Sequence, residues 1–208
     1  MNINKNLVSI IMASYNAEKY IEEAIDSVVS QTYSNWELFV IDDSSNDNSV
    51  KIIKKYSDKD SRIKLIASEI NQGPGPTRNL GLNQAKGRFI AFLDSDDIWN
   101  SKKLETQILF MLKGSIPISY TSYSIIDSLS NKTGRSIIVN NHKLQYNDYL
   151  KNTIIGFSTS IIDTNYFHYK FKLVPLRSRE DTFLWINLLK DENIFALGLN
   201  EKLVKYRV

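Results

Sequence analysis

The chain has 208 residues, of which 42% are hydrophobic and 24% are charged. These proportions are ordinary for a globular protein with a sizeable core, and they exclude a disordered chain. The formal net charge of +3 is too small to indicate binding to nucleic acid. The sequence has no cysteine and only two histidines, which excludes disulfides, a cysteine nucleophile and a multi-histidine metal site.

Neither a targeting signal nor a transmembrane helix is predicted. Residues 1–7 are polar, and the apolar run at residues 8–13 is far shorter than the roughly 20 residues needed to span a bilayer. We therefore expect a cytoplasmic protein. The sequence is also compatible with peripheral contact of this protein with the inner face of the cell membrane.

The first half of the chain alternates between strand-like and helix-like segments. Apolar runs of the kind found in buried parallel strands predict strands at residues 8–13, 36–41, 62–67 and 88–93. Apolar residues at helical spacing predict helices at residues 21–29 and 50–56. The glycine-proline segment at residues 73–76 breaks the chain, and a third helix is expected after it at residues 77–86. Asn16 can cap the first helix, with Glu18 in its first turn. Repeated β-α-β units imply an α/β fold with a mostly parallel central sheet flanked by helices.

The second half is less regular. We expect a helix capped by Ser101, strands at residues 116–126, 132–141 and 156–162, and a helix at residues 180–189. No linker or repeat divides the chain, so residues 1–208 are expected to form a single domain. We divide it into a first half, residues 1–97, and a less regular second half, residues 98–208.

Polar side chains follow three of the predicted strands at the point where each strand ends. They lie at residues 14–16, 42–43 and 94–97. Ligands of open α/β sheets gather at the carboxyl ends of the strands, so these three clusters are expected to share one edge.

Asp94 and Asp96 are separated by one residue after an apolar strand. Such carboxylates can hold a hard divalent ion that bridges to phosphate oxygens. A solvated turn that caps the next helix is an equally open interpretation from spacing alone, and the neighbouring polar strand ends favour the metal. The dinucleotide-binding fingerprint and the P-loop are absent, and the turn after Asp43 lacks the glycine and glutamate of a calcium loop.

Two further segments allow a structural or a functional interpretation. Arg78 follows the glycine-proline loop at residues 71–76 and could bind an anion near a helix N-terminus, or it could be an ordinary surface arginine. Glu180 and Asp181 open an apolar helix and could cap it, or one of them could be a general base. Spacing does not decide between these roles.

Taken together, the order and spacing of these motifs resemble the family 2 glycosyltransferases with the GT-A fold. The resemblance covers nearly the whole chain. The matching stretches are residues 8–16, 30–33, 37–45, 71–73, 78–79, 85–87, 92–97, 180–181, 184–185 and 206–208.

The resemblance implies that residues 1–97 form the half that binds the nucleotide-sugar and residues 98–208 the half that binds the acceptor, and it implies a role for each matching residue. The nucleotide donor would be contacted by Ala13, Tyr15, Asp42, Asp43, Arg78, Asp94 and Ser95. Asp96, with Asp94, would bind Mn²⁺ or Mg²⁺ through the donor diphosphate. Asp181 would deprotonate the acceptor hydroxyl, with Glu180 as the competing candidate.

The resemblance also implies the reaction and its substrates. The enzyme would move a sugar from a nucleotide donor, expected to be a UDP-sugar, to a hydroxyl of a glycan or lipid-linked oligosaccharide. Transfer would proceed by direct displacement with inversion at the anomeric carbon, in bacterial surface-polysaccharide assembly. Stabilising a departing diphosphate and activating one hydroxyl are the physical needs of such a reaction.

Two other functions are alternatives. A phosphatase with Asp94 as nucleophile and Asp96 as acid is disfavoured because its motif normally follows the first strand. For a non-catalytic sugar-nucleotide-binding module, intact Asp96 and Asp181 argue against it and the stop at Val208 argues for it. Relatives often continue past the segment at residues 206–208 with a histidine that reaches toward the metal, whereas this chain stops at Val208 and is expected to be either naturally short or truncated.

Overall fold

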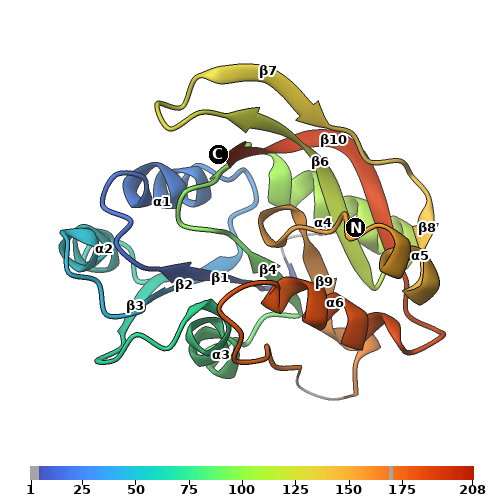
Figure 1. Cartoon of the computed structure of the whole chain (residues 1–208), viewed down its shortest axis with the longest axis horizontal. Helices are drawn as coiled ribbons and strands as arrows, with labels where there is room; N and C mark the ends of the chain where they lie inside the picture. Colours follow the sequence, from blue (N-terminus) through green and yellow to red (C-terminus); the bar gives the residue numbers. More distant parts are fainter. Residues whose placement is uncertain (1–4, 169–170) are drawn as a thin grey trace.

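The computed structural model describes residues 5–168 and 171–208 (Figure 1). Its strands are β1 (Val8–Ser14), β2 (Trp36–Asp42), β3 (Ile63–Ala67), β4 (Phe89–Phe92), β5 (Ile98–Trp99), β6 (Ile118–Ile126), β7 (Lys132–Ile137), β8 (Lys143–Leu144), β9 (Ile161–Asp163) and β10 (Ala196–Arg207). Its α-helices are α1 (Ile21–Val29), α2 (Ser49–Ser57), α3 (Pro74–Gln84), α4 (Lys103–Gly114), α5 (Tyr146–Lys151) and α6 (Glu180–Leu189). The 3₁₀ turns are η2 (Phe157–Thr159) and η3 (Thr164–Tyr166).

Within the described residues, the strands form one mixed sheet that runs through both halves of the chain. Its order is β3-β2-β1-β4-β9-β6-β10-β5, with β7 paired to β6 and β8 to β10. The pairs among β3, β2, β1 and β4 are parallel, as is the β6–β10 pair, whereas β9 is antiparallel to both β4 and β6. The predicted α/β fold with a mostly parallel sheet is confirmed, with antiparallel strands added.

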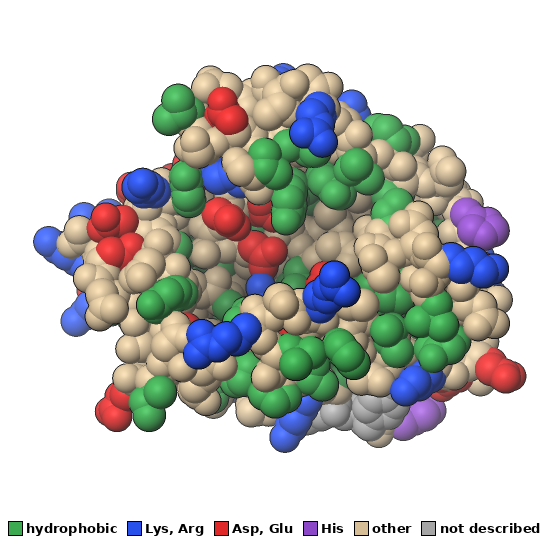
Figure 2. Space-filling view, in the orientation of Figure 1, with side chains coloured by type: hydrophobic (Ala, Val, Ile, Leu, Met, Phe, Trp, Pro, Cys, Tyr) green, Lys and Arg blue, Asp and Glu red, His purple; other side chains and the backbone are tan. Residues whose placement is uncertain are grey.

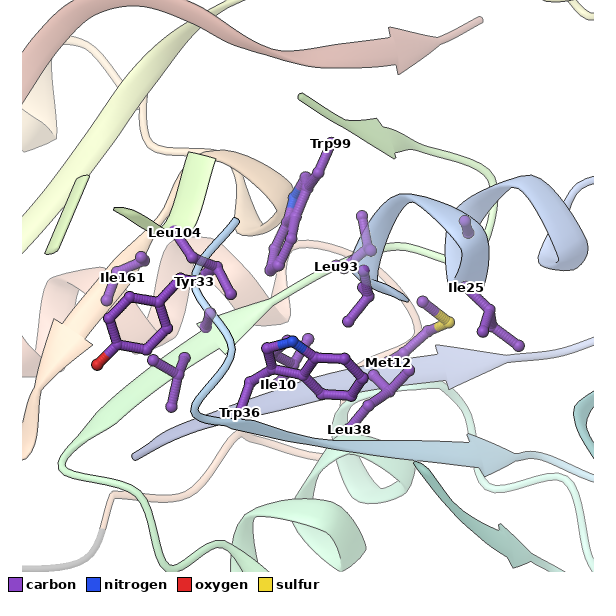
Figure 3. Packing of buried hydrophobic residues seen from close by; sticks show 14 of the residues in the cluster. Ile10, Met12, Ile25, Tyr33, Trp36, Leu38, Leu93, Trp99, Leu104 and Ile161 are labelled. Carbon is purple, nitrogen blue, oxygen red and sulfur yellow. The ribbon is translucent and has the colours of Figure 1, made fainter. Parts of the chain in front are cut away.

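Helices cover both faces of this sheet, and two hydrophobic clusters fill the space between the layers. Alternate residues of β1 point to opposite faces: Ile10 and Met12 pack with α1 and α4, whereas Ile11 packs with the cluster that contains residues of α5 and α6. Figure 3 shows the first cluster, in which Trp36 lies beside Ile10 and Met12 of β1, and Trp99 lies nearer Leu93 and Leu104. Burial on both faces explains why β1 reads as a continuous apolar run.

The segment before α1 differs from its prediction. Asn16 does not cap the helix, which begins at Ile21. Instead the Asn16 side chain accepts a hydrogen bond from the backbone N–H of Asn46 at 2.8 Å, and the Glu18 carboxylate accepts one from the N–H of Asn48 at 2.9 Å. Both side chains therefore tie the end of β1 to the loop after β2.

The strand predicted at residues 156–162 is shorter in the structure and begins later. Residues 157–159 form the η2 turn, and only residues 161–163 form a strand, β9. The hydroxyls of Thr159 and Ser160 donate to the carbonyls of Gly156 and Phe157, both at 2.8 Å. Such local bonds offer the backbone an alternative to sheet pairing.

Lys103 in α4 is fully buried. Its Nζ donates to Gln107 Oε1 at 2.9 Å and lies 4.2 Å from the centre of the Trp99 ring. Burial lowers the pKa of Lys103 well below its ordinary value. The folded protein therefore releases this proton at a lower pH than the unfolded chain does.

We predict that Lys103 makes the fold more stable as pH rises toward 10.5, because below that pH the unfolded chain holds the Lys103 proton more tightly than the folded protein does. The cost of burying the charge is complete below the folded pKa and disappears as pH rises toward the unfolded value of 10.5. Thermal unfolding at a series of pH values should show a shallower rise in Lys103→Met. Parallel curves for the two proteins would contradict this assignment.

Candidate active site

A cleft of about 410 Å³ lies at the carboxyl ends of β1, β2 and β4. Figure 2 shows it as a hollow in the face of the molecule with acidic side chains inside. It is lined by Ala13, Ser14, Tyr15, Asp43, Asn71, Gly73, Pro74, Thr77, Arg78, Asp94, Ser95, Asp96, Arg177 and Tyr206. The three polar strand ends therefore share one edge of the sheet, as the sequence predicted.

Arg78 lies at the back of this cleft and is buried, so its interpretation as a surface arginine is wrong. Its Nη2 is 2.6 Å from Asp94 Oδ1, and its Nη1 is 2.7 Å from Glu180 Oε1. The guanidinium also lies 4.5 Å from the centre of the Phe157 ring. These contacts join α3, the end of β4 and the start of α6.

The two neighbouring aspartates after β2 have different surroundings. Asp43 lines the cleft, and its carboxylate accepts hydrogen bonds from the backbone N–H groups of Gln72 at 2.9 Å and Gly73 at 2.8 Å. Asp42 is buried, is not among the cleft residues, and accepts hydrogen bonds from the backbone N–H and hydroxyl of Ser45. Asp43 thus shapes the loop that forms one wall of the cleft, and Asp42 stabilises its own turn.

That wall depends on two glycines. Gly73 has a φ of 84°, in the left-handed region that side chains disfavour. A Cβ on Gly75 would lie 2.2 Å from the carbonyl oxygen of Val174. The first turn of α3 therefore packs directly against the segment that leads to α6.

Asp94 and Asp96 follow β4 and face the cleft. Burial and the nearby Asp94 carboxylate raise the pKa of Asp96. No group of three or more His, Cys, Asp or Glu side chains in the described ranges is arranged to enclose a metal ion. Two oxygen-donor side chains in an open cleft still fit Mg²⁺ or Mn²⁺, because such ions commonly complete their coordination with substrate phosphates and water.

Asp181 lies in a neighbouring pocket of about 350 Å³, which we call the acceptor-side pocket. Its other lining residues are Tyr123, Ile137, Asn152, Thr153, Ile154, Ile155, Gly156, Phe157, Ser158, Thr159 and Tyr206. Burial and the Asp94 carboxylate raise the pKa of Asp181. Neither acidic residue is the N-cap of α6, which is Arg179. Glu180 is held by Arg78, whereas the Asp181 carboxylate accepts a hydrogen bond from the backbone N–H of Thr182 at 2.7 Å.

Tyr206 lines both the cleft and the acceptor-side pocket. Its ring centre is 5.5 Å from that of Tyr123. Burial and the carboxylates of Asp97, Asp94 and Asp96 raise the pKa of Tyr206 to about 12. The phenol therefore stays neutral near physiological pH and can donate a hydrogen bond between the two pockets.

Arg207 holds the loop after β4 in place. Its Nε donates to the carbonyl oxygen of Asp96 at 2.7 Å, and its backbone N–H donates to Asp97 Oδ1 at 2.9 Å. Its two other guanidinium nitrogens reach Glu23 at 2.7 Å and the carbonyl of Asp127 at 3.1 Å. One buried side chain thus links the candidate metal-binding loop to α1 and to the β6–β7 turn.

Sequence reasoning did not identify Tyr206, Arg207 or Arg177 as site residues from their own pattern. The strand that carries the first two, β10, was not predicted. Apolar residues at positions 196, 197, 199, 203 and 204 were the available signal for it. Its polar stretch at residues 200–202 interrupts that signal, and β10 has register shifts there against β6.

We predict that Arg207→Lys lowers the free energy of unfolding by about 2 kcal/mol, because one ammonium group cannot replace the separate donors of the buried guanidinium. Urea denaturation measures this change. Glu23→Gln, which keeps a hydrogen-bond acceptor for Arg207, should cost less. Equal stability of Arg207→Lys and the unsubstituted protein would show that this network contributes little.

Comparison with known proteins identifies the class to which this fold and cleft belong. The model of the family "Glycosyl transferase family 2" matches residues 9–174. The chain belongs to this family and is a glycosyltransferase.

Two bacterial relatives match almost the whole chain. The chain is 46% identical over 203 residues to the Escherichia coli UDP-Glc:alpha-D-GlcNAc-diphosphoundecaprenol beta-1,3-glucosyltransferase WfgD, covering 97% of this chain and 77% of WfgD. It is 40% identical over 204 residues to TuaG of Bacillus subtilis, a glycosyltransferase assigned to teichuronic acid biosynthesis, covering 98% of this chain and 80% of TuaG. These matches favour an enzyme over a non-catalytic module of the same fold.

Among solved structures, residues 1–349 of Staphylococcus aureus TarS in complex with UDP match with a TM-score of 0.80 and 25% identity. The alignment covers 97% of this chain and 60% of the TarS chain. A mannosyltransferase from Pyrobaculum calidifontis, in complex with GDP-Man and Mn²⁺, matches with a TM-score of 0.67 and 14% identity, covering 93% of this chain and 55% of that one. These likenesses support the predicted GT-A fold.

Proposed function

We propose that the chain transfers a sugar from a UDP-sugar to a hydroxyl group of a lipid-linked glycan, in the assembly of a bacterial surface polysaccharide. The observation that carries this proposal is the position of Tyr206, which lines both the cleft of Asp94 and Asp96 and the pocket of Asp181. A donor in the cleft and an acceptor in the neighbouring pocket would meet at this residue.

The names of the relatives support the choice of substrates. The name of WfgD says that it uses UDP-Glc and an acceptor linked to diphosphoundecaprenol. TarS has been solved in complex with UDP-GlcNAc. We propose UDP as the nucleotide and a lipid diphosphate as the carrier of the acceptor. Such an enzyme would work in the cytoplasm at the inner face of the membrane. Within the described parts of the chain, no helix has the length and apolar character needed to cross a membrane.

Residues of the cleft would hold the donor. Ala13, Tyr15 and Asp43 lie where strand ends meet and would contact the base, with Gln72 and Gly73 fixed by the Asp43 carboxylate. Ser14 Oγ and Arg78 Nε are buried without a hydrogen-bond partner among the described residues, which fits a site that a ligand or water completes. Asp42 would make no contact with the donor, because its carboxylate is already bound to Ser45.

Asp94, Ser95 and Asp96 would lie beside the donor diphosphate, with Asp96 as the principal metal ligand and Asp94 as the second. When bound there, Mn²⁺ or Mg²⁺ supplies positive charge that stabilises the departing diphosphate. Arg78 keeps Asp94 oriented through its 2.6 Å ion pair.

Asp181 would accept the proton of the acceptor hydroxyl while the oxygen of that hydroxyl attacks the anomeric carbon of the donor sugar. The oxygen would approach opposite the departing UDP, so the new glycosidic bond would have inverted configuration. Asp181 is favoured over Glu180 because the Glu180 carboxylate is already engaged by Arg78 at 2.7 Å. Its raised pKa makes Asp181 a stronger base than an ordinary carboxylate.

We expect Asp96→Ala to abolish the effect of Mn²⁺ on UDP binding, because the diphosphate would lose its bridging cation. Calorimetric titration of UDP with and without Mn²⁺ measures this effect. Asp58→Ala, a change of an exposed aspartate after α2, is the matched control and should retain the Mn²⁺ effect. An unchanged Mn²⁺ effect in Asp96→Ala would contradict its role as a metal ligand.

Asp181→Asn is expected to retain UDP binding and to lose sugar transfer by a factor of about 10² or more, as for a missing general base. The assay is transfer from radiolabelled UDP-Glc to GlcNAc-diphospholipid with a shortened lipid chain. Glu180→Gln is the companion variant and should weaken UDP binding as well as transfer, because it disturbs Arg78. Near-normal turnover of Asp181→Asn would move the base to Glu180.

A further inference from the structure

A second concavity, of about 400 Å³, lies between β7 and β10 and is separate from the active-site cleft. Four of its lining residues are cations, namely Lys132, Arg135, Lys202 and Lys205. The other lining residues are Asn100, Ser124, Ile125, Gly134, Ser136, Leu203 and Val204. We call this concavity the basic groove.

The charge of the basic groove is not balanced locally. No Asp or Glu lines it, although Glu201 precedes Lys202 on β10. None of its four cations takes part in an ion pair within residues 5–168 and 171–208. All four are exposed. Since the whole chain has a net charge of only +3, this is a local concentration of positive charge rather than a general property of the surface.

The same hairpin connects the basic groove to the acceptor-side pocket. Four residues of β7 line the groove: Lys132, Gly134, Arg135 and Ser136. Ile137, at the end of β7, lines the pocket that contains Asp181. Large apolar side chains are also exposed along the hairpin: Leu129 at its turn is 78% exposed, and Ile138 is 49% exposed. Figure 1 shows β7 along one edge of the molecule, and Figure 2 shows hydrophobic and basic side chains together on that rim of the hollow.

We propose that the β6–β7 hairpin and the basic groove dock the chain on an anionic membrane. The cations of the groove would contact lipid phosphate groups, and Leu129 and Ile138 would enter the interfacial layer. Juxtaposed basic and apolar side chains are the combination that peripheral proteins use at such surfaces. This inference rests on the proposed function, because a lipid-linked acceptor would reach the acceptor-side pocket from the same membrane.

The test is co-sedimentation with vesicles, without donor or acceptor. One set contains equal parts of phosphatidylglycerol and phosphatidylcholine, and the other contains phosphatidylcholine alone. The variants are two double charge reversals, Lys132→Glu with Arg135→Glu and Lys202→Glu with Lys205→Glu. The matched control is Lys51→Glu with Lys55→Glu, which makes the same change of charge on the exposed face of α2. Circular dichroism confirms that each variant is folded.

The unsubstituted chain should bind the phosphatidylglycerol vesicles, release them at high salt and bind phosphatidylcholine weakly. Each cation contributes about fivefold to such binding, so each groove variant should bind at least tenfold more weakly, whereas the control should lose much less. Equal binding by groove variants and control, or no binding by the unsubstituted chain, would overturn the proposal. Lys132 and Arg135 would then serve only to keep the exposed edge strand β7 from pairing with other chains.

A parallel assay separates this proposal from the proposed function. Transfer to a short-chain acceptor in solution, without vesicles, should be unchanged in the groove variants. Transfer in solution without vesicle binding would overturn the docking surface and leave the glycosyltransferase assignment intact. The opposite result is vesicle binding that depends on the groove, without transfer to any diphospholipid acceptor. It would support the membrane-docking surface and overturn the proposed acceptor.

Discussion

The buried guanidinium of Arg78 holds together parts of the site that are far apart in the sequence. Its two ion pairs reach Asp94, 16 residues away, and Glu180, 102 residues away. Removing one partner of a buried pair typically costs about 3 to 5 kcal/mol, because the remaining charge is left without compensation. The position of α3 therefore sets the positions of both carboxylates. Gly81 lets that helix approach the sheet closely, since a Cβ there would lie 2.6 Å from Ile41.

Much of the first half of the fold could be predicted from sequence because its signals are local. Each buried parallel strand is an apolar run, α1 and α2 show apolar residues at helical period, and the glycine-proline segment marks the start of α3. The handedness and order of β-α-β units then bring the carboxyl ends of the strands to one edge. For this reason Tyr15, Asp43 and Asp94 could be placed in one cleft before any contact between them was known.

What could not be predicted depends on partners that are distant in the chain. Nothing in the local pattern of Asp42 and Asp43 shows that one carboxylate binds Ser45 while the other orders the loop at Gly73. The bond from Arg207 to the Asp96 carbonyl joins residues 111 positions apart, and a periodicity search has no access to it. The antiparallel insertion of β9 is a similar case, because three strand residues give too short a pattern to fix direction.

Tyr206 has a consequence for altering the specificity of this enzyme. Since this one side chain belongs to the walls of both pockets, a change that enlarges one of them also enlarges the other. With the donor in one pocket and the acceptor in the other, as proposed, sugar preference and acceptor preference would not be independent at this position. Directed evolution toward a new acceptor would have to avoid Tyr206, or accept a simultaneous drift in the choice of donor.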